Sequence, residues 1–205
     1  MPRRPDMPPL QREDLDRDPI AQFATWFRIA EREAPLPEAI TLATVDADGE
    51  PDARMVLLKG VDAEGFRFFT NHESAKGGQL ESGAGAALVI YWRELDRQVR
   101  VRGVVERLGE AESDAYFATR SRDSQIGAWA SPQSQPLESR EQLDDRVREA
   151  EARFADREVP RPGHWGGYLV RARTIEFWQG QVGRLHDRFC YTRTGGCWQI
   201  ERLAP

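Results

Sequence analysis

The feature that most constrains the fold is a change of hydrophobic period at Ala39. Before it, residues 19–33 place apolar side chains at helical spacing, with Asp18 as the N-cap and Pro19 in the first turn. After it, apolar and polar residues alternate as they do in β-strands, and Asp-Gly and similar turns interrupt the alternation. This region predicts five strands and one short helix (74–82), the strands lying at 39–46, 52–60, 66–71, 86–92 and 97–108.

The rest of the chain returns to helical spacing and then to strands. Helices are expected at 110–131 and 139–155, and strands at 164–180, 188–193 and 197–203. Because so many strands leave few edges unprotected only when the sheet closes, we expect a small closed barrel with helices outside it. The predicted class is mainly β with flanking helices (α+β), with six to eight antiparallel strands. Residues 1–18 are expected to form a flexible arm, and 19–205 a single domain.

Composition excludes several classes of function. The chain has 205 residues and a net charge of −5, which argues against a nucleic-acid partner because phosphate contacts favour a basic stripe. It contains no apolar run of membrane-spanning length and no secretory signal, so no membrane is expected and the cytoplasm is the default location. Cys190 and Cys197 are too few for a metal site and are expected to be buried free thiols.

Phosphate-binding loops of the GxxxxGK[ST] and GxGxxG types are absent, so side chains would have to hold any phosphate. One candidate is the strand "RMVLLK", residues 54–59. Strand alternation separates Arg54 from Lys59 unless the strand bulges near Lys59. Two cations at the ends of an apolar strand are more often there for solubility.

A second candidate is the segment "AYFATRSRDSQIGAW". Tyr116, Arg120 and Ser124 are spaced i, i+4 and i+8, so on a continuing helix they form one polar stripe. A phenol, a guanidinium and a hydroxyl all donate hydrogen bonds, which a phosphate dianion needs. A solvated helix face is an equally good explanation of the spacing alone.

Two further polar groupings lie on predicted strands. Gln98 shares a strand face with two arginines and looks either onto a site or onto water. The stretch "GQVGRLHDRF", residues 180–189, is unusually charged for a strand junction, and a solvated turn or a structural ion-pair knot would explain it. If the chain is extended there, Arg184, His186 and Arg188 share one face, and Asp187 is expected to pair with one of the arginines.

Taken together, several segments resemble one family. They are "RMVLLKG", "FRFFTNHESAKG", "RQVRVRGVVERL", "YFATRSRDSQIGAWASPQS", "PRPGHWGGYLV", "IEFWQG", "RLHDRFCY" and the terminal "WQIERLAP". In this order, from about residue 10 to the end, they are similar to the pyridoxamine (pyridoxine) 5′-phosphate oxidases.

The resemblance implies an FMN-binding split β-barrel, a homodimer with FMN held without a covalent bond at the subunit interface. It implies oxidation of pyridoxamine 5′-phosphate and pyridoxine 5′-phosphate to pyridoxal 5′-phosphate, with O2 as acceptor and H2O2 as product. Such an enzyme, a pyridoxal 5′-phosphate synthase, serves vitamin B6 biosynthesis and salvage.

The resemblance also implies roles for individual residues. Arg184 and His186 match catalytic residues that hold the pyridine ring. The substrate-binding positions are Lys59, Tyr116, Arg120, Ser124, Arg184, Leu185 and His186. The positions matching FMN contacts are Arg54, Met55, Val56, Leu57, Leu58, Lys59, Phe69, Thr70, Lys76, Gln98, Gln133, Ser134, Trp178 and Arg188. No metal is implied.

One position departs from the family pattern. Family members commonly have Arg-Lys after the serine of "ESAK", whereas this chain has Ala75 before Lys76. The loss of one cationic contact to the FMN phosphate would cost about 1–3 kcal/mol. Two other functions fit part of the pattern: a related split-barrel flavoprotein oxidase with another substrate, such as a phenazine precursor, and a non-catalytic binder of FMN or pyridoxal phosphate.

Overall fold

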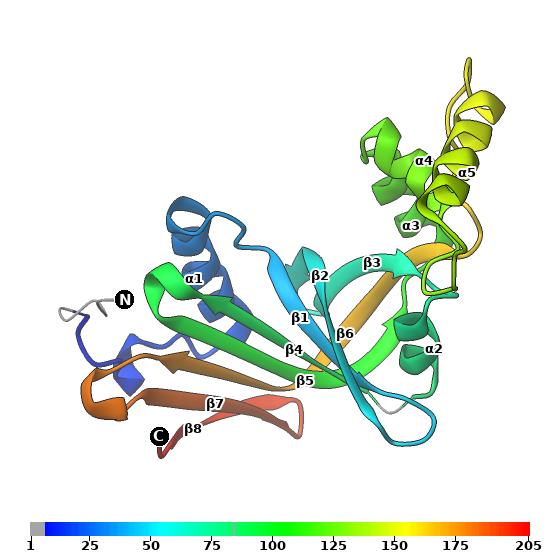
Figure 1. Ribbon diagram of the computed structural model, residues 1–205. Helices are drawn as coiled ribbons and strands as arrows, with labels where there is room; N and C mark the ends of the chain where they lie inside the picture. Colours follow the sequence, from blue (N-terminus) through cyan, green and yellow to red (C-terminus); the bar gives the residue numbers. More distant parts are fainter. Residues whose placement is uncertain (1–6, 84) are drawn as a thin grey trace.

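The computed structural model describes residues 7–83 and 85–205, in which one antiparallel sheet closes into a barrel (Figure 1). The strands are β1 (Ala39–Val45), β2 (Pro51–Asp62), β3 (Gly65–Asn71), β4 (Ala86–Trp92), β5 (Arg97–Arg107), β6 (Trp165–Gln179), β7 (Asp187–Thr194) and β8 (Cys197–Leu203). Their order is β3-β2-β1-β4-β5-β6-β7-β8, and β3 also pairs with β6. Six strands therefore form the closed barrel and β7–β8 extend it, which confirms the predicted antiparallel barrel with flanking helices.

The first helix, α1 (Pro19–Glu33), packs onto the barrel as the sequence predicts. Asp18 caps it by accepting a hydrogen bond from the Ile20 amide. On its buried face, Phe23 meets Phe66 edge-on at 5.1 Å and Trp26 meets Phe177 at 5.2 Å. These aromatic contacts join the helix to β3 and β6, the two strands whose pairing closes the barrel.

Two irregularities shape the barrel strands. The β2–β3 register shifts between Leu58 and Gly60, and the β5–β6 register shifts between Arg102 and Gly103. At Gly103 an added Cβ would lie 2.0 Å from the carbonyl oxygen of Arg171, so only glycine fits the close approach of the two strands. Such bulges bend and twist the strands that carry them.

The remaining helices gather at one end of the barrel (Figure 1). They are α2 (Ala75–Glu81), α3 (Glu110–Ala118), α4 (Arg122–Ala130) and α5 (Arg140–Arg153). The prediction of one continuous helix over 110–131 is wrong, because α3 ends at Ala118. Ser121 then caps α4 by accepting a hydrogen bond from the Ser124 amide. A serine side chain that bonds to the backbone in this way favours a helix start over a helix interior.

Residues 7–18, part of the predicted flexible arm, pack against the barrel. Leu10 and Leu15 are buried, and the Tyr191 hydroxyl donates to the Asp16 carbonyl at 2.7 Å. Residues 1–6 lie outside the described residues. Two of its partners, Asp187 and Tyr191, lie more than a hundred residues away in the sequence, so the Pro-rich composition alone carries no sign of them.

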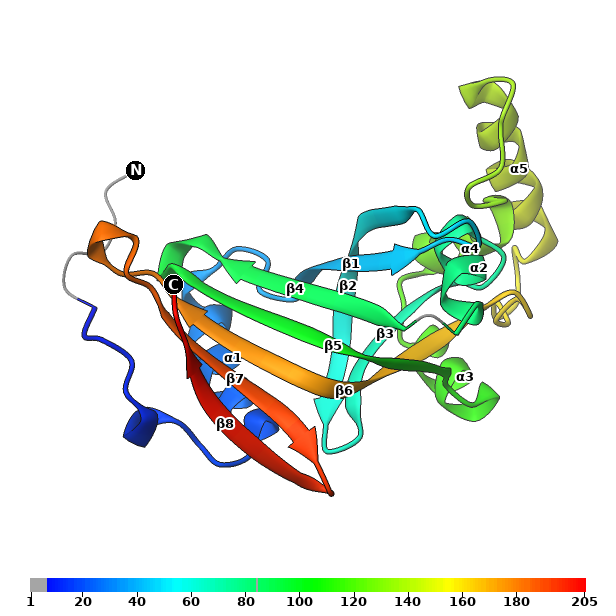
Figure 2. The same ribbon diagram turned by 90° about the horizontal axis from the view of Figure 1, so that it is seen from below.

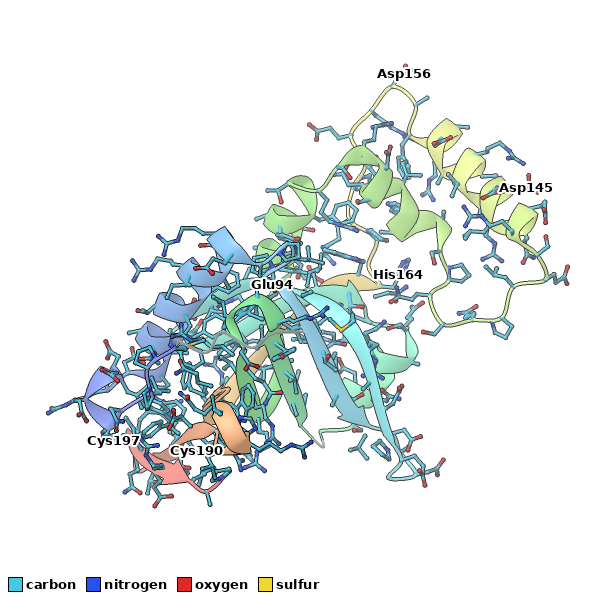
Figure 3. The ribbon with its side chains drawn as sticks, turned by 60° about the vertical axis from the view of Figure 1, so that its left-hand side comes forward. Glu94, Asp145, Asp156, His164, Cys190 and Cys197 are labelled. Carbon is cyan, nitrogen blue, oxygen red and sulfur yellow. The ribbon has the colours of Figure 1, made fainter. Side chains whose placement is uncertain are left out.

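Both cysteines are free, as predicted, but their predicted burial is wrong. Cys190 is half-buried on β7, and Cys197 is exposed because it opens β8 opposite Thr194 (Figure 3). Among the described residues, no helix combines the length and apolar character that crossing a membrane requires.

Candidate active site

A pocket of about 610 Å³ opens between the barrel wall and the helices at its end. Strands β2 and β3 form one side, and helices α3 and α4 the other. Eleven predicted site residues line it: Met55, Val56, Leu57, Lys59, Phe69, Thr70, Lys76, Tyr116, Arg120, Ser124 and Gln133. The structure therefore brings both predicted phosphate-binding segments into one cavity, although they belong to different elements.

Because side chains alternate along β2, some of the residues predicted to contact FMN face the pocket and others face the barrel core. Met55 and Leu57 are exposed along the pocket, whereas the Leu58 side chain is buried in the core. Arg54 does not line the pocket; it forms an ion pair with Asp52 and donates to Gln79 Oε1 at 2.7 Å. The β2–β3 register shift falls at Lys59. From the sequence, a bulge near this residue was the condition for Lys59 to leave the regular alternation of the strand.

Arg120 is the most unusual cation of the pocket. Its Nη1 is buried without a hydrogen-bond partner among the described residues, and its guanidinium lies 4.6 Å from the centre of the Trp165 ring. Burial lowers the pKa of Arg120, and the nearby Tyr116 opposes this shift. A buried donor without a partner costs free energy, and an anion that entered the pocket beside Nη1 would remove that cost.

An aromatic wall supports this arginine. Phe69 stacks on Tyr116 at 4.0 Å and on Trp165 at 5.6 Å. Burial raises the pKa of the Tyr116 hydroxyl, which keeps it protonated as a donor at neutral pH. Trp165 was not predicted as a site residue. The two glycines that follow it in "HWGG" are a signal for it, since glycine in a strand marks close approach of other groups.

A polar group at the start of α2 forms another side of the pocket. Lys76 Nζ donates to Gln133 Oε1 at 2.9 Å and to Ser74 Oγ at 3.2 Å. Burial and the neighbouring Arg54 lower the pKa of Lys76, while Asp52 raises it. Ser134, the next predicted residue, has φ +71° and does not line the pocket. This corner therefore holds a second partly buried cation.

The other predicted residues form a separate cluster at the junction of β5, β6 and β7. Gln98 pairs in register with Trp178, and Trp178 pairs with Arg188. The His186 ring lies 4.6 Å from the Trp178 ring, and Arg188 forms an ion pair with Glu176 at 2.9 Å. The structure thus brings Gln98, Trp178, Arg184, Leu185, His186 and Arg188 to one end of the sheet.

The loop that carries Arg184 differs from the extended chain expected there. Residues Val182–Arg184 form a 3-10 turn in which Gly183 and Arg184 have φ +71° and +64°. Because β7 begins only at Asp187, the shared face predicted for alternate residues does not apply to Arg184. Asp187 pairs with Arg202 at 2.7 Å rather than with an arginine of its own loop. The expected partner was wrong because the Arg202 side chain arrives from β8.

Within one chain the two clusters lie far apart. Trp165 of the pocket and Trp178 of the second cluster stand near opposite ends of the 15-residue strand β6. At ~3.3 Å per residue this strand is roughly 45 Å long. Figures 1 and 2 both show α3–α5 at one end of the molecule and the β6–β7 connection at the other. A single chain therefore does not unite all predicted site residues.

Comparisons with known proteins cover nearly the whole chain. Residues 30–154 match a family model described as pyridoxamine 5′-phosphate oxidase, and residues 165–205 match one described as the pyridoxine 5′-phosphate oxidase C-terminal dimerisation region. Pyridoxine/pyridoxamine 5′-phosphate oxidases from Rubrobacter xylanophilus and Paraburkholderia phytofirmans are each 54% identical. The matches cover 96% and 94% of this chain and 91% of each relative.

Two solved structures are also similar. PhzG from Burkholderia lata, in complex with tetrahydrophenazine-1-carboxylic acid, superposes with a TM-score of 0.91 at 32% identity over 98% of both chains. An FMN-binding protein from Nostoc punctiforme, described as related to pyridoxamine 5′-phosphate oxidase, has a TM-score of 0.73 at 17% identity. That match covers 92% of this chain and 98% of the other, and at this identity it speaks for the fold alone.

Proposed function

The chain belongs to the pyridoxamine 5′-phosphate oxidase family, and we propose that it oxidises both pyridoxamine 5′-phosphate and pyridoxine 5′-phosphate to pyridoxal 5′-phosphate. O2 is the final acceptor and H2O2 the second product; the amine substrate also consumes water and releases ammonia. The observation that carries this proposal is the buried Arg120 Nη1, a cationic donor without a partner, in a pocket that also holds Lys59 and Lys76.

The residues present fit FMN as the cofactor. Lys76 and Thr70 offer donors toward a phosphate or a flavin edge, and the exposed side chains of Met55 and Leu57 offer an apolar surface for a planar ring. When bound, FMN supplies the two-electron oxidising capacity that amino-acid side chains lack. The protein's part is to bind the ring, orient it and exclude water from its face.

We assign the substrate phosphate to the Arg120 end of the pocket. Tyr116 lies in α3, Arg120 in the break between α3 and α4, and Ser124 in α4, while Lys59 approaches from the β2 bulge. Four donors of this kind match a phosphate dianion, whose charge strengthens each hydrogen bond. The break between the helices is what allows Ser121 to add a hydroxyl to the same lining.

The second cluster completes the site from the partner copy of a homodimer. Val182 and Leu185 beside it are 71% and 72% exposed, and Met55 in the pocket is 61% exposed. Exposed apolar side chains that lie next to each other, as Val182 and Leu185 do, are typical of an interaction surface, and residues 165–205, which carry all of the cluster except Gln98, match a dimerisation region. In this arrangement Arg184 and His186 of one copy reach the substrate bound in the pocket of the other.

The test is aerobic turnover by the purified protein. We expect a yellow protein that converts pyridoxine 5′-phosphate to an aldehyde product, followed by absorbance, with one H2O2 formed per aldehyde. A protein that takes up FMN but turns over neither phosphorylated substrate would contradict the proposal and favour a carrier. A protein that takes up no FMN would contradict any flavin-dependent reaction.

A second candidate rests on the similarity to PhzG, whose structure contains a tetrahydrophenazine-1-carboxylic acid. A phenazine precursor of that kind carries a carboxylate and no phosphate, so it would leave part of the Lys59, Tyr116, Arg120 and Ser124 donor set without a partner. Parallel assays with both substrate classes separate the candidates. Faster turnover of the phenazine precursor would overturn the assignment to the phosphorylated pyridines.

A further inference from the structure

Asp187 lies beside the proposed ring-holding residues, yet the proposed chemistry assigns it no role. Its side chain is buried, at 6% exposure, and three groups donate to its carboxylate. The Leu10 amide and Gln181 Nε2 donate to Oδ2, each at 2.9 Å, and Arg202 Nη1 donates to Oδ1 at 2.7 Å. A buried carboxylate with this many donors is a strong local restraint.

Gln181 links this carboxylate to His186. Its side chain is held by Asp187, while its backbone amide donates to His186 Nδ1 at 3.1 Å. An imidazole nitrogen that accepts a hydrogen bond carries no proton, so the proton of the neutral ring must lie on Nε2. A proton on Nδ1 would instead face the Gln181 N–H and lack an acceptor there.

The N-terminal segment meets the same restraint. Arg202 Nη2 donates to the Leu10 carbonyl at 2.7 Å, and Gln179 Nε2 donates to the Pro8 carbonyl at 2.9 Å. The carboxylate therefore joins three parts of the chain: the segment around Leu10, the loop at 181–186, and β8. The strained turn at Gly183 and Arg184 lies between two anchored points, Gln181 and Asp187.

We propose that Asp187 is a positioning residue that, through Gln181, holds His186 as its Nε2–H tautomer. His186 then donates a hydrogen bond to the oxygen or amine of the substrate and does not accept a proton from it. This inference rests on the proposed function for the role of the histidine, but the tautomer itself is a property of the protein without substrate.

The tautomer can be measured directly by nitrogen-15 NMR of the imidazole rings in the FMN-loaded, substrate-free protein. The chain has three histidines, and the signal lost in His186→Asn identifies the ring of interest. We expect the wild-type ring to have a protonated Nε2 and an unprotonated Nδ1. In Asp187→Asn the Gln181 side chain loses its carboxylate, and we expect the two nitrogen signals to move toward each other as both tautomers become populated.

Turnover gives the second readout. We expect kcat/KM for pyridoxine 5′-phosphate to fall about tenfold in Asp187→Asn, the loss of roughly one oriented hydrogen bond, while FMN affinity is unchanged. Asp145→Asn is the matched control, because Asp145 is an exposed aspartate of α5 paired with Arg148. It should leave both the histidine signals and kcat/KM as in the wild type.

If Asp187→Asn does not fold, Gln181→Met serves instead, since it keeps the backbone donor to His186 and removes the side-chain hydrogen bonds to Asp187 and to the Pro8 carbonyl. The same changes are expected. A wild-type ring protonated on Nδ1, or a variant with unaltered histidine signals and kcat/KM, would overturn the inference. If the wild type turned over neither phosphorylated substrate, the proposed function would fail while the NMR result still decided the tautomer.

Discussion

Arg120 is a residue whose proposed role in phosphate binding is accompanied by a cost in the stability of the protein without ligand. Its buried Nη1 has no partner among the described residues, which costs free energy in the protein without ligand. The ring of Trp165 offsets part of that cost by a cation–π contact at 4.6 Å. If Arg120 binds the substrate phosphate as proposed, replacing it should affect stability and binding in opposite directions.

For Arg120→Met we expect KM for pyridoxine 5′-phosphate to rise about 30-fold or more, since a charge-assisted hydrogen bond contributes ~2 kcal/mol or more. The free energy of unfolding should rise by about 1 kcal/mol, because a half-buried guanidinium whose Nη1 has no partner among the described residues is removed. Steady-state kinetics and urea denaturation measure the two effects. Arg148→Met, on the exposed face of α5, is the control, and an unchanged KM in Arg120→Met would contradict the phosphate assignment.

Ala75 is the position at which the family commonly carries a further cation. It is exposed at the start of α2, beside Lys76. We expect Ala75→Arg to lower the Kd for FMN about tenfold, since an added charge-assisted contact is worth ~1–3 kcal/mol. Fluorescence quenching of FMN measures the change, and Ala152→Arg on α5 controls for the added charge. Equal Kd values in Ala75→Arg and the wild type would place the FMN phosphate elsewhere.

At the scale of elements, the β-bulges determine which side of the sheet the side chains next to them face. The shift at Lys59 takes that residue out of the regular alternation of β2, and the shift at Gly103 allows β5 to approach β6 closely. A pattern of alternating residues predicts the strands, but it does not predict the position of an inserted residue.

For Gly103→Ala we expect a loss of about 2–3 kcal/mol in the free energy of unfolding, because the new Cβ would lie 2.0 Å from the Arg171 carbonyl oxygen and the strands would have to separate. Gly163→Ala is the matched control, since nothing lies within 4 Å of a Cβ there and its φ is not in the left-handed region. Chemical denaturation of both variants is the measurement. Equal stability would show that the bulge tolerates a side chain.

The contact of His72 with Tyr168 of β6 predicts a pH dependence of stability. His72 lies before α2, its Nδ1 is buried without a partner among the described residues, and its ring meets Tyr168 at 5.0 Å. Burial lowers the pKa of His72, Arg107 adds to this and Glu81 opposes it.

A pKa below the ordinary 6.5 means that the unfolded chain takes up this proton first as the pH falls. The contribution of His72 to stability is therefore complete above pH ~7 and is lost as the pH falls through the ordinary pKa of 6.5. We expect the free energy of unfolding of the wild type to drop more steeply over this range than that of His72→Gln. Denaturation curves at several pH values measure both slopes, and parallel curves would contradict the assignment.

At the scale of the whole molecule, the two halves of the site lie at opposite ends of one chain. Trp165 and Trp178 are separated by most of the length of β6, yet each belongs to a cluster of predicted site residues. A two-fold pair solves this geometry by placing the pocket of each copy against the loop of the other.

Subunit mixing tests this arrangement. At substrate concentrations well below KM, Arg120→Ala and Arg184→Ala should each be nearly inactive alone. After unfolding and refolding together, half of the dimers should contain both variants, and each mixed dimer should have one intact site. We expect about a quarter of the wild-type activity per chain, a value that follows from random pairing in a two-fold dimer. No recovery of activity would mean that each site lies within one chain.

Features that depend on neighbouring residues could be predicted, whereas features that depend on distant contacts could not. Helix α1 with its Asp18 cap, the strands and the family were predicted from local patterns and from the order of motifs. Two features depend on contacts that no local pattern contains: the partner of Asp187 and the packing of residues 7–18. The break before α4 is different, because the Ser121 cap that marks it is a local signal that the prediction of a continuous helix overlooked. The Arg202 side chain that meets Asp187 comes from a different strand, so no spacing rule could select it.

The sequence by itself determined the periods, the Asp18 cap and the candidate polar stripe of Tyr116, Arg120 and Ser124, because these depend on residues close together along the chain. The tertiary structure alone decided which donors share a cavity and which arginine is left without a partner. It also decided that the Arg184 loop lies far from that cavity in one chain. Closure of the barrel between β3 and β6 sets these distances, and it depends on pairing between residues about a hundred positions apart.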